Sequence, residues 1–244
     1  MKHKIGSTGW LALLLPFLFI GISHAAIVTK KLSDETRAVS GFHAIENIGS
    51  IDLEISIGNT ESLKIFGNKE VIDLVETQVK NGTLVISIKK DGQRFFNNWK
   101  VNKNLLIQIS AKSLNALSQR GSGNIVVKNP IKGDKFQLSL TGSGDITVPV
   151  NVSSLTATIV GSGDISMQGT ATSADVSVSG SGDFDGDSLK TQDANTKISG
   201  SGDIDIYVSN TLNAQLSGSG DISYGGNPKQ VNKRKSGSGE ISSR

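Results

Sequence analysis

The chain has 244 residues, of which 36% are hydrophobic and 28 are glycine, and its formal net charge is +3. A hydrophobic fraction of this size is typical of globular proteins and argues against a wholly disordered chain. Because the chain has no cysteine, disulfide frameworks, thiolate metal sites and lipid attachment to an N-terminal cysteine are excluded, and three histidines leave little room for histidine-dependent catalysis.

The first 25 residues predict an export signal. Lys2 and Lys4 precede a mostly apolar run at residues 10–22, and Ser23 and Ala25 are small residues that suit cleavage after Ala25. The apolar run is short for a transmembrane helix, so an uncleaved anchor is only the alternative. We therefore expect an exported protein of the periplasm, the outer-membrane surface or the extracellular space, with no transmembrane segment after cleavage. Cleavage lowers the net charge to +1, so no nucleic-acid partner is expected.

Residues 26–120 predict an N-terminal β region of irregular organisation. Three segments alternate apolar and polar residues as strands with one buried face do: residues 51–57, 63–65 and 105–109. Asn81-Gly82 is typical of a tight turn between two strands. Residues 69–79 are interpreted either as one short helix or as an irregular excursion.

A polar stretch at residues 91–104 predicts a protruding loop with three aromatic side chains: Phe95, Phe96 and Trp99. Flat rings beside basic and amide groups suit binding to a glycan or a protein. The alternative is that the rings fold back over one end of the β core, because an open end exposes apolar side chains and unpaired strand edges.

Residues 121–244 are organised by a repeat that begins with Gly-Ser-Gly. Seven copies start 18 to 21 residues apart, at Gly121, Gly142, Gly161, Gly180, Gly200, Gly218 and Gly237. Between these corners, two short runs of alternating apolar residues flank a second, polar corner. One unit cannot bury its apolar face alone, so successive units are expected to stack. The sequence thus predicts an all-β protein, a β-solenoid resembling a parallel β-helix with coils of ~19 residues. A meander of antiparallel hairpins is the competing interpretation.

Acidic residues follow the corners at one position of the repeat: Asp145, Asp164, Asp183, Asp203 and Asp221, with Asn124 and Glu240 at the ends. In a solenoid they would stack about 5 Å apart. Calcium, which prefers oxygen ligands, would relieve the repulsion between them. The alternative, which the sequence favours, is that each aspartate accepts a backbone N–H bond at its own corner. The calcium-binding roll uses a nine-residue repeat, which this chain lacks, and no other cofactor is expected.

Charge is distributed unevenly along the repeat. Residues 136–228 have a net charge of −8, whereas basic residues gather at the C-terminal end: Lys229, Lys233, Arg234, Lys235 and Arg244. We interpret this basic end as a solvated tail that blocks edge-to-edge association. Contact with anionic lipid or lipopolysaccharide is the alternative.

Three segments resemble the head GIN domain family, bacterial envelope proteins described as candidate auto-transporter adhesins. Residues 37–55 (RAVSGFHAIENIGSIDLEI) are similar to its opening strands, residues 79–88 (VKNGTLVISI) to its central hairpin, and residues 105–125 (LLIQISAKSLNALSQRGSGNI) to its entry into glycine-corner repeats. The resemblance covers nearly the whole mature chain. It implies a β-solenoid-like fold and export, and it brings no catalytic residue set.

The sequence favours an exported, non-catalytic binding module whose repetitive β surface contacts a glycan or a protein at the cell surface. A structural or self-assembling envelope protein is the alternative. A polysaccharide-active enzyme is favoured less, because such enzymes gather Asp, Arg or Lys side chains in a groove. Residues 136–228 contain no arginine and few insertions that would build one.

Overall fold

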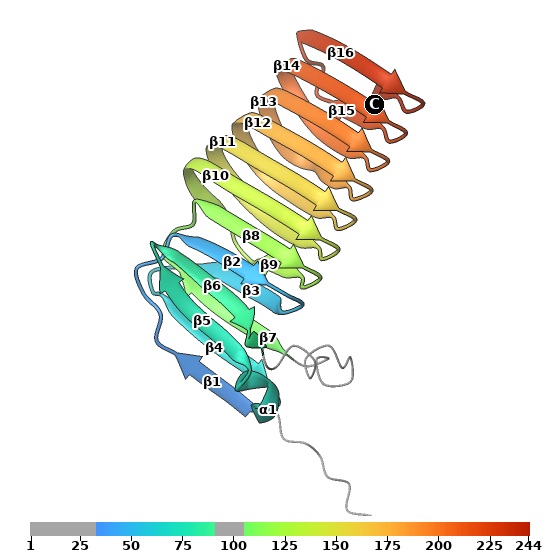
Figure 1. Cartoon of the computed structure of the whole chain (residues 1–244). Coiled ribbons are helices and arrows are strands. Elements are labelled where there is room, and N and C mark those ends of the chain that lie inside the picture. The colour runs from blue at the N-terminus through green and yellow to red at the C-terminus, as the bar shows by residue number, and fades with distance from the viewer. Residues whose placement is uncertain (1–32, 91–104) are drawn as a thin grey trace, which may run out of the picture. The chain divides into compact units, whose positions relative to one another are not determined.

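The computed structural model describes residues 33–90 and 105–244, which form one sheet system of seventeen strands and one short helix (Figure 1). The predicted signal peptide and the aromatic residues Phe95, Phe96 and Trp99 lie outside the described residues. No helix in the described part of the chain is long and apolar enough to cross a membrane.

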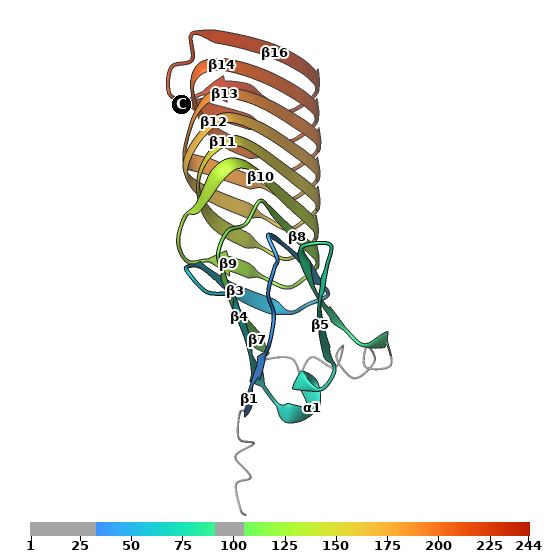
Figure 2. The same ribbon diagram turned by 90° about the vertical axis from the view of Figure 1, so that its left-hand side faces the viewer.

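Long parallel strands form the regular part of the stack. Five of them wrap around it one after another: β10 (Ile131–Gly142), β11 (Ile146–Gly161), β12 (Ile165–Gly180), β13 (Phe184–Gly200) and β14 (Ile204–Gly218). Each pairs in parallel with the next, and the first glycines of successive corners are partners. The wrapping is visible in Figure 2. Parallel pairing in the register of the repeat confirms the predicted β-solenoid and excludes the hairpin meander.

In β11 to β14 the second polar corner does not divide the coil into two strands, which the sequence analysis expected. Hydrogen-bonded pairing continues through it, and Asn151 in β11 still pairs with Thr170 in β12. In a parallel stack the backbone bonds run between coils, so a coil can bend while its inter-coil ladder is kept. The polar side chains at the bend mark where the chain faces water and not where the strand ends.

The core is one continuous cluster between the faces of the stack. In β11 the alternating residues Ile146, Val148 and Val150 point inward before the bend, and Leu155 and Ile159 point inward after it. All five side chains are almost completely buried, and burying a side chain of this size stabilises a fold by about 1.5–3 kcal/mol. The alternation seen in the sequence is therefore what holds a cysteine-free chain together.

The corners are tight because coil backbones touch there. Gly161 has φ +129°, and a Cβ atom on it would lie 2.3 Å from the carbonyl oxygen of Gly142 in the preceding coil. The backbone N–H groups of Ser162 and Gly163 both donate to that oxygen. Glycine is required at this position both by the left-handed backbone and by the close approach.

Parallel stacking extends into the predicted N-terminal β region. Strands β2 (Ala44–Ile48) and β3 (Asp52–Ile57) form a coil between two others. On one side lie β8 (Ala116–Gly121) and β9 (Ile125–Val127). On the other side lie β6 (Thr83–Ile88) and β7 (Leu106–Ala111), again in parallel.

Antiparallel strands finish the N-terminal end of the stack: β1 (Ser33–Arg37) and β4 (Ser62–Gly67) beside β7, and β5 (Val75–Lys80) beside β6. The helix α1 (Lys69–Ile72) connects β4 to β5, and its buried Val71 and Ile72 close the core. The segment expected at residues 69–79 is thus one helical turn followed by a strand. Asn81-Gly82 makes the predicted turn, with φ angles of 49° and 75°.

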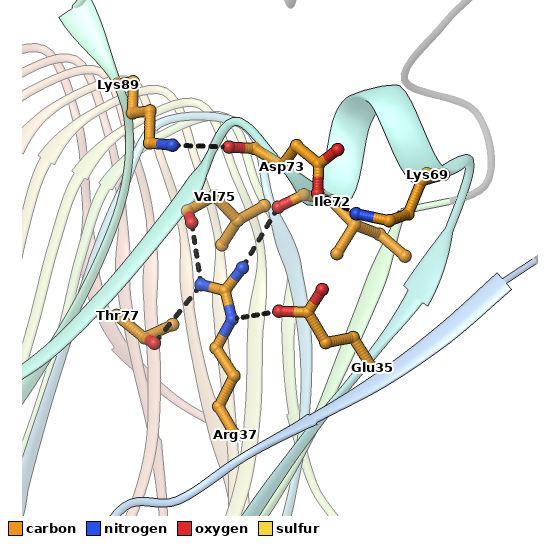
Figure 3. Close-up of polar contacts among 8 residues, drawn as sticks. All are labelled: Glu35, Arg37, Lys69, Ile72, Asp73, Val75, Thr77 and Lys89. Atoms are coloured by element: carbon orange, nitrogen blue, oxygen red, sulfur yellow. Dashed lines mark hydrogen bonds and ion pairs between the residues drawn. The ribbon is translucent and has the colours of Figure 1, made fainter.

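Arg37 joins two edge strands at this end (Figure 3). Its guanidinium donates to the carbonyl oxygens of Val75 (2.7 Å) and Ile72 (3.1 Å), to the Thr77 hydroxyl (3.3 Å) and to the Glu35 carboxylate (2.7 Å). Within the described residues β1 pairs only with β4, and β5 only with β6. The Arg37 guanidinium therefore links β1 to the carbonyl oxygens of Ile72 and Val75, although β1 and β5 do not pair with each other.

Candidate functional site

The acidic residues after the corners form a column along the stack. A side-chain oxygen of each member except the last accepts the backbone N–H of its counterpart in the next coil, at 2.7–3.3 Å, through the series Asn124, Asp145, Asp164, Asp183, Asp203, Asp221 and Glu240. The expected bond at the residue's own corner is therefore replaced by one between coils. The parallel register causes this difference, because it places the next N–H group beside each carboxylate.

The column has one more member, which the sequence analysis missed. Asp52 accepts the N–H of Asn124 at 2.8 Å. It follows the corner Gly49-Ser50-Ile51, which has isoleucine where the other corners have their second glycine. The shared pattern Gly-Ser-x-Asp was the available signal.

No three acidic or histidine side chains of the described residues come together as metal ligands. In the aspartate column, one oxygen of each of Asp145, Asp164, Asp183, Asp203 and Asp221 already has a backbone donor. Calcium binding by this column stays a prediction. The binding or capping role of Phe95, Phe96 and Trp99 also stays a prediction.

A second column, absent from the sequence analysis, lies on the strand segments that lead into the corners. The Nδ2 group of Asn195 donates to Asp175 (2.6 Å), that of Asn213 donates to Asn195 (2.8 Å), and that of Asn232 donates to Asn213 (2.8 Å). We call these four side chains the amide ladder. Each lies five residues before the first glycine of the next corner, and this constant offset was the signal in the sequence.

Shallow hollows follow the amide ladder across the stack. One of about 320 Å³ lies beside Asp175 and Asn195, and one of about 630 Å³ lies beside Asn213 and Asn232. A third, of about 210 Å³, is bordered by two basic residues of the outer face, Lys197 and Arg234. Neighbouring hollows share lining residues, so they form one track. The strand segments under it are the row of parallel arrows facing the viewer in Figure 1.

The basic end is a strand and not a tail. Strand β16 (Gln230–Gly237) pairs with β14, while β17 (Ile241–Ser243) pairs with β15 (Ile222–Gly225). Lys233 stacks on Ala214 and Lys235 on Leu216, so both lysines occupy positions that face the core in the preceding coil. The Lys233 ammonium donates to the carbonyl oxygen of Ile241 at 2.8 Å and lies 4.9 Å from the centroid of the Tyr224 ring.

Arg244 links this last coil to earlier coils through hydrogen bonds and ion pairs. Its backbone N–H donates to the carbonyl of Tyr224 (3.0 Å), and its guanidinium forms a two-point contact with Asp187. The same guanidinium lies 3.6 Å from a carboxylate oxygen of Asp205. Burial raises the pKa of Asp205, and the nearby Arg244 charge opposes that rise.

Comparison with known proteins agrees with this architecture. A family model described as "Putative auto-transporter adhesin, head GIN domain" matches residues 41–228. No curated protein matches the chain.

Solved structures of similar architecture come from Bacteroides and Parabacteroides species. A "putative adhesin" of Bacteroides fragilis is 26% identical with a TM-score of 0.82, and the match covers 88% of this chain and 98% of that one. A "putative lipid binding protein" of Parabacteroides distasonis is 26% identical with a TM-score of 0.72 and the same coverage. A "putative adhesin" of Parabacteroides merdae, 22% identical with a TM-score of 0.68, covers 88% of this chain and 97% of its own, and shows the fold alone.

Proposed function

The chain belongs to the head GIN domain family, described as "Putative auto-transporter adhesin", and on this premise we propose that it is an exported, non-catalytic module that binds a glycan or a protein at the bacterial cell surface. The observation that carries the proposal is the amide ladder with its track of hollows. Hydrogen bonds between coils hold these polar side chains in a fixed row on a sheet face. A rigid row of polar groups suits recognition of an extended ligand, because little side-chain entropy is lost when the ligand binds.

The names of two relatives also indicate binding. Both 26%-identical structures are named for adhesion or binding, and neither is named for a reaction. The family description also concerns adhesion. These names support a binding role for this chain.

Charged side chains at both ends of the stack argue against the structural or self-assembling alternative. Glu35 and Arg37 of the edge strand β1 stand opposite the buried Ile65 and Leu63, and Lys233 occupies a core-facing position in β16. Charges that point inward on an edge strand disfavour pairing with another sheet. End-to-end polymerisation would have to bury them.

Protease digestion of intact cells that produce the full chain tests the proposal. Digestion before the outer membrane is opened, together with weaker attachment of cells from which the gene has been deleted, is the expected result. A periplasmic protein of the same cells must stay intact as the control. Protection until the outer membrane is opened would contradict a role in adhesion.

A further inference from the structure

The amide ladder leaves a row of hydrogen-bond donors on the surface. An asparagine side chain carries two N–H groups and one carbonyl oxygen. In Asn195, Asn213 and Asn232 one N–H bonds to the preceding member, and the carbonyl groups of Asn195 and Asn213 accept from the following one. One N–H per asparagine is not used by the ladder, and it recurs about every 4.8 Å along the stack.

Two basic side chains, with a neutral amide between them, run beside this row. Lys197, Gln215 and Arg234 each lie two residues after a ladder asparagine and stack on one another in the parallel register. Among residues 33–90 and 105–244, Lys197 and Arg234 have no ion-pair partner. An anion bound here would gain positive partners without breaking an existing ion pair.

The residues that line the hollows along this part of the ladder suit an anionic ligand. In the described structure, no acidic side chain lines the 630 Å³ hollow or the 210 Å³ hollow. Serine hydroxyls at Ser217 and Ser236 and the amide of Gln215 add groups that exchange hydrogen bonds with sugar hydroxyls. Lys197 is one of only two basic residues in the acidic stretch 136–228, and Arg234 belongs to the basic C-terminal end.

The shape of the site is linear. The ladder has three intervals, so it extends for about 14 Å along the stack at ~4.8 Å per coil. Asp175 at its first member repels an anion and limits the track on the N-terminal side. A narrow row of donors suits a chain molecule better than the flat surface of a lipid bilayer.

We propose that the track from Asn195 to Ser236 binds a carboxylate-bearing polysaccharide, with the amide N–H groups and the cations Lys197 and Arg234 contacting its acid groups. This inference rests on the proposed binding function and names its ligand class. The chain binds the polymer without cutting it.

The test measures binding of the full, exported chain to polygalacturonate by calorimetry, with the uncharged polymer pullulan as the comparison. We expect binding to polygalacturonate alone, weaker at higher salt because exposed charges are screened. The variant Lys197→Glu/Arg234→Glu should bind roughly tenfold more weakly, since each exposed ion pair contributes up to about 1 kcal/mol. Asn213→Asp, which keeps an acceptor for Asn232 but loses the donor, should also weaken binding.

Lys132→Glu/Lys135→Glu on β10 is the matched control, because it makes the same charge change at exposed positions away from the track. It should bind like the unsubstituted chain, and thermal melting should show that all variants are folded.

The proposal is overturned by absent binding, by equal loss in both charge variants, by equal binding of pullulan, or by tighter binding to phosphatidylglycerol vesicles. If polygalacturonate is not bound while cell attachment persists, only this inference fails. If the polymer is bound but the protein is protected in intact cells, the surface function fails and the site remains.

Discussion

Asn124 occupies the same position in the column as the five aspartates and accepts the same backbone bond, from Asp145 at 2.9 Å. At this position an amide carbonyl oxygen therefore accepts the same backbone hydrogen bond as a carboxylate oxygen. The aspartate column stabilises the stack through its acceptor oxygens, whereas the stacked negative charges repel one another.

Substituting Asp164 separates these two effects. Asp164→Asn keeps an acceptor for the N–H of Asp183, which lies 2.9 Å away, so the free energy of unfolding should be unchanged or slightly higher. Asp164→Ala removes the acceptor and should lower it by about 1 kcal/mol. Urea unfolding of both variants measures the difference. Equal damage from both would show that the charge itself is needed.

Removal of calcium tests whether the aspartate column binds calcium. We expect the melting temperature to be the same with calcium and with a chelator, because one oxygen of Asp145, Asp164, Asp183, Asp203 and Asp221 already has a backbone donor. Magnesium in place of calcium is the control for ionic strength. A fall in melting temperature on chelation alone would support calcium binding.

Gly161 gives a prediction about the corners. Gly161→Ala adds a Cβ atom 2.3 Å from the Gly142 oxygen at a φ of +129°, so we expect a loss of about 3 kcal/mol in stability. Gly133→Ala is the control, because nothing lies within 4 Å of its added Cβ, and it should leave stability unchanged or raise it slightly. Chemical unfolding measures both. Similar results for the two variants would contradict the packing argument.

At the residue scale the sequence predicted the aspartate column but not the amide ladder. The aspartates share a visible motif with the corners. The ladder asparagines lie between corners, and their constant offset gains meaning only when the parallel register brings Asn195 beside Asn213. Asp52 was missed because Ile51 replaces a glycine of the motif.

At the scale of elements, alternation of apolar residues predicted the strands correctly where one side of the strand faces the core. It failed for β16, whose sequence QVNKRKSG contains almost no apolar residue. This segment is a strand because β14 offers it an unpaired edge, and the backbone bonds do not depend on side-chain polarity. Local sequence alone therefore suggested a tail.

Arg37 gives a prediction for β1, a strand with no buried residue. Arg37→Met removes the donors to Ile72 and Val75, and opening of β1 should become easier by about 2 kcal/mol. Hydrogen exchange should be faster in β1 and β5 and unchanged in β11 to β13, because each coil of a solenoid contacts mainly its neighbours. Lys64→Met, which removes an exposed ion pair with Asp34 on the same strand pair, is the control and should change little. Faster exchange throughout the stack would contradict this local role.

At the scale of the whole stack, the C-terminal end decides whether coils from two molecules can join. Among the described strands, β16 pairs with β14 alone, and Val231 and the lysines at 233 and 235 lie over the core-facing Leu212, Ala214 and Leu216. Lys233→Val/Lys235→Leu would restore an apolar inner face on this strand. We expect this variant to associate with itself, since an apolar, uncharged edge strand is a template for another sheet.

Analytical ultracentrifugation compares the mass of this double variant with that of the unsubstituted chain. Arg234→Leu is the control, because this side chain points away from the core on the same strand and should not promote association. If the double variant keeps the mass of the unsubstituted chain, the inward lysines are not what prevents stacking, and the self-assembling alternative regains support.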